Sequence, residues 1–153
     1  MRGERTKCVR RDPDADNWRH GGGPRVQFEC MPGDLADLVA WREAALLARD
    51  AIAAARRIQG VGAAAAADQL VRAAESISAN IAEAYGRGFG KDGTRFLRVA
   101  RGSATELESH LWIACETRRI PVPVAGALMS HTRRVRALLR GLIQSSAGCA
   151  PRG

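Results

Sequence analysis

Aromatic side chains, lysine and alternating apolar-polar runs are all scarce in this chain. Aromatic residues make up 5% of its 153 residues, and lysine occurs only at Lys7 and Lys91. A half-buried β-strand reads as an alternating run, so the scarcity of such runs disfavours a β-sheet. Alanine is abundant instead, and it is the strongest helix former. The composition therefore predicts an all-α fold, in a length that suits one domain.

The sequence also lacks closely spaced metal-binding or catalytic residues. Zinc sites need clustered cysteine and histidine ligands, and the cysteines stand far apart. A di-iron bundle needs Glu-x-x-His pairs, and none of the three histidines follows a glutamate at that spacing. We therefore expect no enzymatic activity, no catalytic residue, no metal and no cofactor.

Long hydrophobic runs are missing as well. No run is long enough to span a bilayer, and no apolar signal segment follows Met1. The cysteines read as free thiols, which persist in a reducing compartment; they are Cys8, Cys30, Cys115 and Cys149. The expected location is the cytoplasm, with no membrane partner.

Negative charge is absent from the last part of the chain. The formal net charge is +8, and residues 121–153 hold five arginines and no acidic residue. A helix that carries only positive charge favours an anionic partner such as nucleic acid.

The chain divides into a tail, a helical region and a short end. Residues 1–33 are charged, rich in glycine and proline, and aperiodic, which predicts a flexible, disordered tail. Residues 34–146 carry four helical patterns in succession. Residues 147–153 are expected to fray.

Capping and breaking residues mark the expected helix boundaries. Asp34 is placed to cap the first helix and Asp92 the third. The alanine run 63–67 is expected to open the second helix, because alanine favours helix over linker. Pro121 ends the third helix, and Pro123 suits the first turn of the fourth.

Apolar residues repeat at helical spacing and mark one buried face on each helix. The first face comprises Leu35, Leu38, Val39, Ala45, Leu46 and Ile52, widened by Trp41 and Leu47. The second comprises Leu70, Ala73, Ala74, Ile77, Ile81 and Ala84. The third comprises Phe96, Leu97, Ala100, Ala104, Leu107, Leu111 and Ala114, and the fourth Val124, Leu128, Val135, Leu138, Leu139 and Leu142. Short turns make neighbours antiparallel, so we predict an antiparallel up-down four-helix bundle.

Two polar stripes run beside the central faces. The second helix carries Ser76, Asn80, Glu83 and Arg87, and the third carries Ser103, Glu106 and His110. Counting outward from the turn gives the expected pairs Asn80 with Ser103, Ser76 with Glu106, and Glu83 with Arg98. We expect the stripes to face each other and to satisfy each other's hydrogen bonds.

The turn between these helices, residues 88–93, matches the G-x-G-x-x-G pattern. A dinucleotide site needs that pattern after a strand, and here it follows a helix. The Walker A pattern also fails, because Tyr85 occupies its first glycine position and Asp92 follows Lys91. Backbone N–H groups at a helix start can hold a phosphate weakly, but a simple connection between helices is the favoured interpretation.

Arginines gather on the third and fourth helices. The candidate nucleic-acid-binding residues are Arg95, Arg98, Arg101, Arg133, Arg136 and Arg140. Such a face can neutralise phosphates and make binding depend on salt. The alternative to nucleic-acid binding is that these arginines are simply solvated, or that they pair with Glu106, Glu108 or Glu116. The competing function is a protein-protein interaction scaffold that binds no nucleic acid.

Two segments carry a family resemblance. QLVRAAESISANIAEAYGR and FLRVARGSATELESHLWIA resemble the four-helix-bundle proteins found as reading frames in intervening sequences of bacterial 23S rRNA genes. DLVAWREAALLA is similar to that family's first helix, so the resemblance covers roughly residues 34–145. Ala84 departs from the family's NIAEG segment. The superfamily includes the accessory variability determinant proteins of diversity-generating retroelements.

The resemblance implies a ring-like homo-oligomer, a pentamer in known relatives. The retroelement relatives bind nucleic acid and a reverse transcriptase through a basic surface. The motif carries over, as fold and assembly residues, to Arg72, Ser76, Asn80, Glu83, Arg87, Gly102, Ser103, Glu106 and Leu107. The expected function is a non-enzymatic homo-oligomer that binds RNA or DNA, as an accessory to a reverse transcriptase or in association with rRNA.

Overall fold

The computed structural model describes residues 34–148, with side chains described up to Ser146. Its α-helices are α1 (Val39–Ala55), α2 (Ala63–Gly86), α3 (Lys91–Glu116) and α4 (Val122–Gly148). No strand occurs among residues 34–148, so the all-α prediction is confirmed. The predicted tail, residues 1–33, and the last residues, 149–153, lie outside the described part.

The chain divides before Leu38 into two compact units. The described part of the first is a 3-10 turn, Leu35–Asp37 (η2), in which the Asp34 N–H donates to the Asp37 carboxylate over 3.3 Å. The first α-helix begins only at Val39, and Leu38 makes no side-chain cap bond there. The prediction that Asp34 caps this helix was wrong, because the 3-10 turn intervenes.

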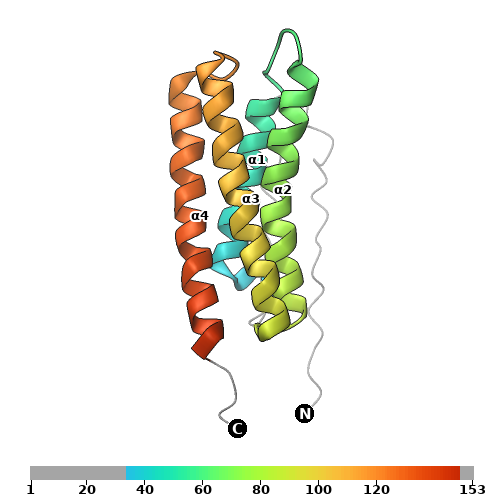
Figure 1. Ribbon diagram of the computed structural model, residues 1–153, viewed down its shortest axis with the longest axis vertical. Coiled ribbons are helices and arrows are strands. Elements are labelled where there is room, and N and C mark those ends of the chain that lie inside the picture. Colours follow the sequence, from blue (N-terminus) through green and yellow to red (C-terminus); the bar gives the residue numbers. More distant parts are fainter. Residues whose placement is uncertain (1–33, 149–153) are drawn as a thin grey trace, which may run out of the picture. The chain divides into compact units, whose positions relative to one another are not determined.

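The second unit is a four-helix bundle (Figure 1). α1 packs on α2, α2 on α3, α3 on α4, and α4 back on α1. The connections alternate between the two ends of the bundle, so neighbouring helices are antiparallel (Figure 1). This confirms the up-down arrangement. α1 has 17 residues against 27 in α4, which makes it roughly 15 Å shorter at about 1.5 Å per residue.

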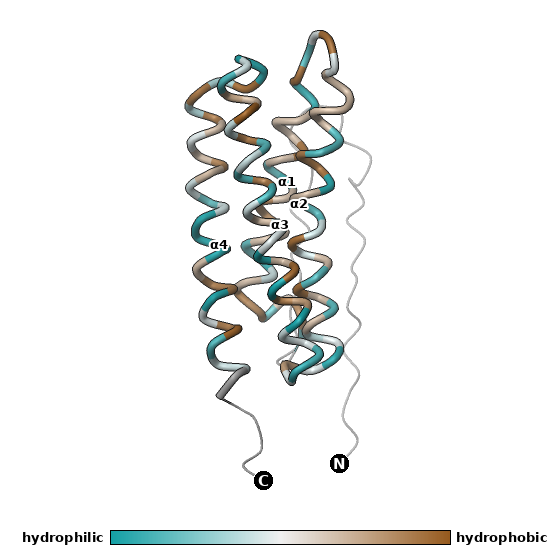
Figure 2. Tube along the Cα trace, viewed as in Figure 1, coloured by the Kyte–Doolittle hydropathy of each residue, from teal (hydrophilic) through white to brown (hydrophobic). Residues whose placement is uncertain are grey.

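The core consists mainly of alanine and branched aliphatic side chains. Apolar and polar positions alternate around every helix (Figure 2). The predicted face of α2 is buried at all six positions. The predicted face of α3 is buried too, except that Phe96 is only partly buried. Periodicity therefore located the two central faces correctly.

The predicted face of α1 was only partly correct, because it included the buried Leu47 but missed the buried alanines. Its buried residues are Ala40, Ala44, Leu47, Ala48, Ala51, Ala54 and Ala55. Val39 and Leu46 are 45% and 42% exposed instead. The prediction followed the larger apolar side chains, whereas a face of alanines lets a helix lie close to its neighbours. The start of α4 shows the same error, because Ala125 is buried there while Val124 is 37% exposed.

Helix boundaries follow the expected breakers more closely than the expected caps. α2 begins at Ala63, within the alanine run. Pro123 lies in the first turn of α4, as predicted. The prediction that Pro121 ends the third helix was wrong, because α3 already ends at Glu116 and Pro121 directly precedes α4. α3 begins at Lys91 without a side-chain cap bond, so Asp92 is a first-turn acid and not the predicted cap.

The α2–α3 turn accounts for the glycine pattern. Gly88 adopts a positive φ of 68°, which glycine tolerates best. A Cβ at Gly93 would overlap the carbonyl oxygen of Gly88 and lie 2.9 Å from that of Ala84. The outer glycines of the G-x-G-x-x-G pattern are thus required by a tight turn between helices.

Candidate functional site

The polar stripes of α2 and α3 meet at one hydroxyl pair. Ser76 Oγ lies 2.8 Å from Ser103 Oγ, across the seam between the helices. Asn80 Nδ2 supports this pair, because it donates to the Ser76 carbonyl oxygen at 2.7 Å and to Ser76 Oγ at 3.1 Å. Ser103 is buried, and this small network satisfies its hydroxyl group.

The predicted register of the two stripes was wrong. The expected pairs were Asn80 with Ser103, Ser76 with Glu106, and Glu83 with Arg98. Since Ser76 bonds to Ser103, the helices are offset by about one turn from that count. The reason is that α3 begins at Lys91, inside the stretch that was counted as a turn.

Glu83 of α2 pairs with Arg87, which directly follows the helix. Arg87 Nε donates to Glu83 Oε1 at 2.5 Å, one helical turn apart. The Arg87 guanidinium carbon also lies 4.9 Å from the ring centroid of Phe96 on α3. The arginine therefore joins the two helices through a cation-π contact.

Arg72 and Glu106 make exposed contacts within their own helices. Arg72 Nε lies 2.9 Å from Asp68 Oδ2 on α2. Glu106 Oε1 lies 3.7 Å from His110 Nε2 on α3, with the glutamate 57% exposed. Exposed pairs of this kind stabilise a helix by only a few tenths of a kcal/mol.

Charge gathers where α3 packs on α4. Glu108 of α3 accepts a hydrogen bond from Arg133 Nε at 2.7 Å, and Arg136 Nη1 donates to its other oxygen. The Glu108 side chain is 20% exposed, whereas that of Arg133 is 65% exposed. One partly buried carboxylate thus holds two arginines.

Arg101 and Arg140 extend this cluster. Arg101 precedes Glu108 by seven residues and Arg140 follows Arg133 by seven, which is two helical turns in each case. Because α3 and α4 are antiparallel, both displacements run toward the same end of the bundle. Both residues are exposed, and their guanidinium groups bond to no other described side chain. We call Arg101, Glu108, Arg133, Arg136 and Arg140 the basic seam.

The remaining two candidate arginines lie off the seam. Arg98 and Arg95 precede Arg101 by three and six residues, and each step of three turns the side chain by about 60° around the helix. Both are exposed on the outer side of α3. The structure therefore gathers four of the six predicted arginines and leaves two apart.

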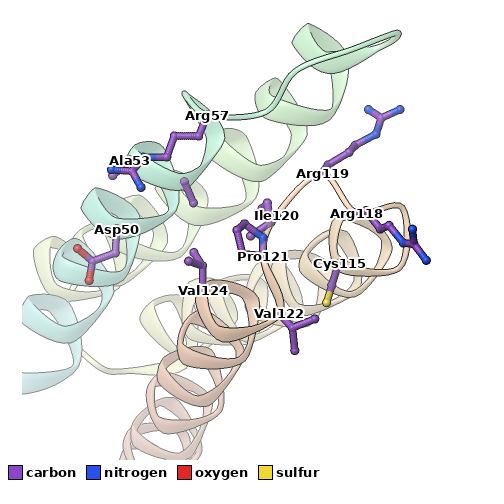
Figure 3. A pocket seen from close by; sticks show the side chains of 11 residues that line it. Asp50, Ala53, Arg57, Cys115, Arg118, Arg119, Ile120, Pro121, Val122 and Val124 are labelled. Carbon is purple, nitrogen blue, oxygen red and sulfur yellow. The ribbon is translucent and has the colours of Figure 1, made fainter.

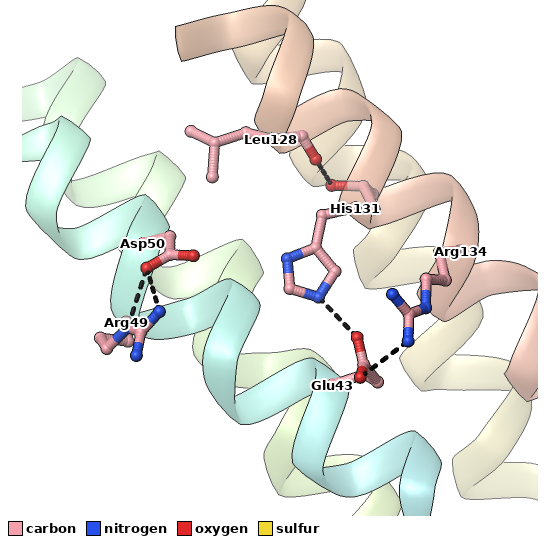
Figure 4. Close-up of polar contacts among 7 residues, drawn as sticks. Glu43, Arg49, Asp50, Leu128, His131 and Arg134 are labelled. Atoms are coloured by element: carbon pink, nitrogen blue, oxygen red, sulfur yellow. Dashed lines mark hydrogen bonds and ion pairs between the residues drawn. The ribbon is translucent and has the colours of Figure 1, made fainter. Parts of the chain in front are cut away.

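A second ion-pair network joins α1 to α4 (Figure 4). Glu43 Oε2 lies 3.0 Å from His131 Nε2, and Arg134 Nη2 donates to Glu43 Oε1 at 3.1 Å. The Glu43 side chain is only 16% exposed. Sequence reasoning missed this network, because it depends on the register between the first and last helices.

Another ion pair lies beside this network on α1. Arg49 Nε donates to Asp50 Oδ1 at 2.8 Å (Figure 4). This hydrogen bond and the negative charge of Asp50 raise the pKa of the Arg49 guanidinium. The pair lies within one helix and brings together no further groups.

A cavity of about 680 Å³ opens between α1 and the α3–α4 turn (Figure 3). Arg118 and Arg119 line it, but their guanidinium groups point away from α1 (Figure 3). Arg119 donates instead to the carbonyl oxygens of Val61 and Gly62, at 2.9 and 3.1 Å. A ligand site needs polar groups that converge, and the arginines at this cavity diverge.

Other kinds of site find little support in the described part of the chain. Within residues 34–148, no three His, Cys, Asp or Glu residues are grouped to hold a metal ion. None of the helices in the described part of the chain is long and apolar enough to cross a membrane. Cys115 is a partly buried free thiol. The basic seam is thus the feature that most suggests a ligand, because its positive charge suits an anionic group.

Comparison with known proteins agrees with the fold. The profile of the family described as 23S rRNA-intervening sequence protein matches residues 36–141. The bundle is similar to a protein with unknown function from the S23 ribosomal protein family of Bacteroides thetaiotaomicron VPI-5482, with a TM-score of 0.61 and 20% identity. That alignment covers 69% of this chain and 99% of the other. None of the curated proteins matches the chain.

The family match spans most of the helical region, and the structural likeness supports the same fold. The helices carry the segments that resemble the family, and the match includes every residue of the basic seam. This chain belongs to the 23S rRNA-intervening sequence protein family.

Proposed function

We propose that the protein is a non-enzymatic bundle that binds RNA or DNA through its basic seam. The observation that carries this proposal is the charge imbalance of the seam. The seam contains four arginines and one carboxylate, Glu108. Glu108 binds Arg133 and Arg136, whereas Arg101 and Arg140 bond to no other described side chain. Exposed guanidinium groups in a row suit phosphates along a nucleic-acid backbone.

The family name supports RNA as the first partner to test. It describes proteins of 23S rRNA intervening sequences. In this proposal the protein acts in the cytoplasm, either in association with rRNA or as an accessory to a reverse transcriptase. Contacts to the backbone bind without reading the base sequence, so we expect little sequence preference.

Self-assembly is part of the proposal, with a pentamer as the expected form. Val39, Leu46 and Ala53 follow one another at intervals of seven on the exposed side of α1. Such an apolar line suits contact with a second copy. A ring of copies would repeat the seam and strengthen weak phosphate contacts through effective concentration. Mass measurement of the assembly in solution tests this point, and a monomer at all concentrations would contradict it.

Titration of labelled RNA and DNA at several salt concentrations tests the binding proposal. The double variant Arg101→Gln, Arg140→Gln should bind more weakly. Its plot of log affinity against log salt should be shallower by about 0.7–0.9 for each phosphate that the variant no longer neutralises. The matched control removes the same charge from exposed positions, by Arg42→Gln in α1 and Arg56→Gln directly after it. No binding at low salt, or an equal loss in both double variants, would overturn the proposal.

A protein-interaction scaffold is the second candidate. Arg133 and Arg136 of the seam bind the carboxylate of Glu108, and an acidic protein would offer the same groups. Capture of an acidic protein by the wild type together with no affinity for RNA or DNA at low salt would favour the scaffold.

A further inference from the structure

An exposed tryptophan lies in line with the basic seam. Trp112 of α3 is 59% exposed. Tryptophan is usually well buried in folded proteins because its large apolar surface avoids water. An indole left open in this way has a flat face available for a ligand.

Helix spacing places Trp112 on the seam side of α3. Trp112 follows Glu108 by four residues, and Arg101 precedes Glu108 by seven. At about 100° per residue, these three positions fall within about 40° of one another around the helix. Glu108 faces α4, because it contacts Arg133 and Arg136. Trp112 and Arg101 therefore flank the ion-pair cluster, about 16 Å apart along α3.

The facing part of α4 leaves the indole uncovered. Because the helices are antiparallel, Trp112 lies level with the α4 turn that precedes Arg133. That turn presents Ser130, and the turn before it presents Gly126; both are exposed. A Cβ placed on Gly126 would meet no atom within 4 Å, so space is open there. Small residues on α4 thus leave room for a planar group against the indole.

We propose that the ligand of the basic seam is single-stranded nucleic acid, with a base stacked on Trp112 while the arginines hold the phosphates. This inference rests on the proposed function and specifies its ligand. Single strands offer unstacked bases, and proteins bind them with aromatic side chains beside a positive groove. In a duplex the base faces are stacked on each other, so Trp112 adds nothing to duplex binding.

Affinity for single strands and for duplexes of the same sequence tests the inference. Trp112→Ala should weaken single-strand binding about tenfold, a typical loss for one base–aromatic stack. Duplex binding should not change. Trp112→Phe should retain most of the single-strand affinity, because a phenyl ring also stacks. Ile113→Ala is the matched control, since Ile113 is 54% exposed but points to another side of α3.

Tryptophan fluorescence supplies a direct readout. Single strands should quench the fluorescence of the wild type, and Trp112→Phe should abolish that quenching although Trp18 and Trp41 remain. Unchanged quenching in Trp112→Phe would overturn the inference.

The outcomes separate this inference from the proposed function. Wild-type affinity in Trp112→Ala, with a loss in Arg101→Gln, Arg140→Gln, would overturn the stacking and leave the proposed function standing. A wild type that binds neither form would end both. A change in the mass of the assembly in Trp112→Ala would mark Trp112 as a contact between copies and would also overturn the stacking.

Discussion

α3 packs on α2 and on α4 through two seams whose polar contacts differ in kind. Toward α2, α3 presents a buried serine that shares a hydroxyl hydrogen bond, and a glycine that lets the turn pack against it. Toward α4, it presents the Glu108 carboxylate, which binds Arg133 and Arg136. Arg101 and Arg140 lie nearby and bond to no described side chain. The first seam satisfies its own polar groups, whereas the second leaves two arginines exposed without a described side-chain partner. The stripes that identify the family therefore lie apart from the surface proposed to bind.

The largest expected effect lies at the α2–α3 turn. Gly93→Ala should lower the free energy of unfolding by about 3 kcal/mol, because the new methyl group overlaps backbone oxygens that cannot move away easily. Urea unfolding measures the change. Gly102→Ala on the same helix is the control: a Cβ there meets no atom within 4 Å, so it should stabilise by about 0.5–1 kcal/mol. Equal effects of the two variants would show that the turn is not tightly packed.

The hydroxyl pair should contribute less. Ser103→Ala removes the partner of Ser76 and should cost about 1 kcal/mol of unfolding free energy. Ser109→Ala changes an exposed position of the same helix and should stay within about 0.5 kcal/mol of the wild type. Thermal unfolding compares the two. If Ser103→Ala left the unfolding free energy unchanged, the α2–α3 seam would be held by apolar packing alone.

A substitution at the α3–α4 seam should change both the stability of the protein and its affinity for nucleic acid. Glu108→Gln should cost roughly 0.5–1 kcal/mol of stability, because Glu108 is mostly buried but Arg133 is mostly exposed. It should also strengthen binding to RNA or DNA, since Arg133 and Arg136 lose their competing carboxylate. Unfolding and salt titration of one preparation measure both effects. Weaker binding in this variant would count against the basic seam as the binding surface.

Changing the exposed Glu83–Arg87 pair should have little effect on stability and none on binding. Glu83→Gln removes the same charge as Glu108→Gln, from a carboxylate that is 46% exposed. The unfolding free energy should fall by at most about 0.5 kcal/mol, and binding should stay as in the wild type. Stronger binding in Glu83→Gln would show that net charge, and not the position of the charge, controls affinity.

Prediction from the sequence succeeded where local periodicity was strong. The buried faces of α2 and α3 came out almost complete, because their leucines and isoleucines recur at helical spacing. It failed in part on α1, where the buried face is alanine apart from Leu47 and the larger residues Val39 and Leu46 lie outside. An alanine carries little hydrophobic signal, yet it packs well where helices approach closely. Pattern reasoning therefore weights the wrong face of such a helix.

For the candidate site, the sequence supplied the residues and not their partners. All the arginines of the seam were expected to bind, and pairing with Glu108 was one of the open alternatives. Trp112 and the Glu43–His131 contact were not anticipated, because each depends on which turn of α4 lies beside which turn of another helix. An error of one turn, as between Ser76 and Ser103, is enough to exchange every partner across a seam.

By itself, the sequence determined that this chain forms four antiparallel helices of the 23S rRNA-intervening sequence protein family. That information is local, because helix periodicity, alanine content and the breakers at the turns act within a few residues. Only the tertiary structure decided which charges neutralise one another and which stay available. The reason is that ion pairing across a seam depends on the offset and rotation of whole helices. Those are determined by the packing of small side chains and by the length of the turns.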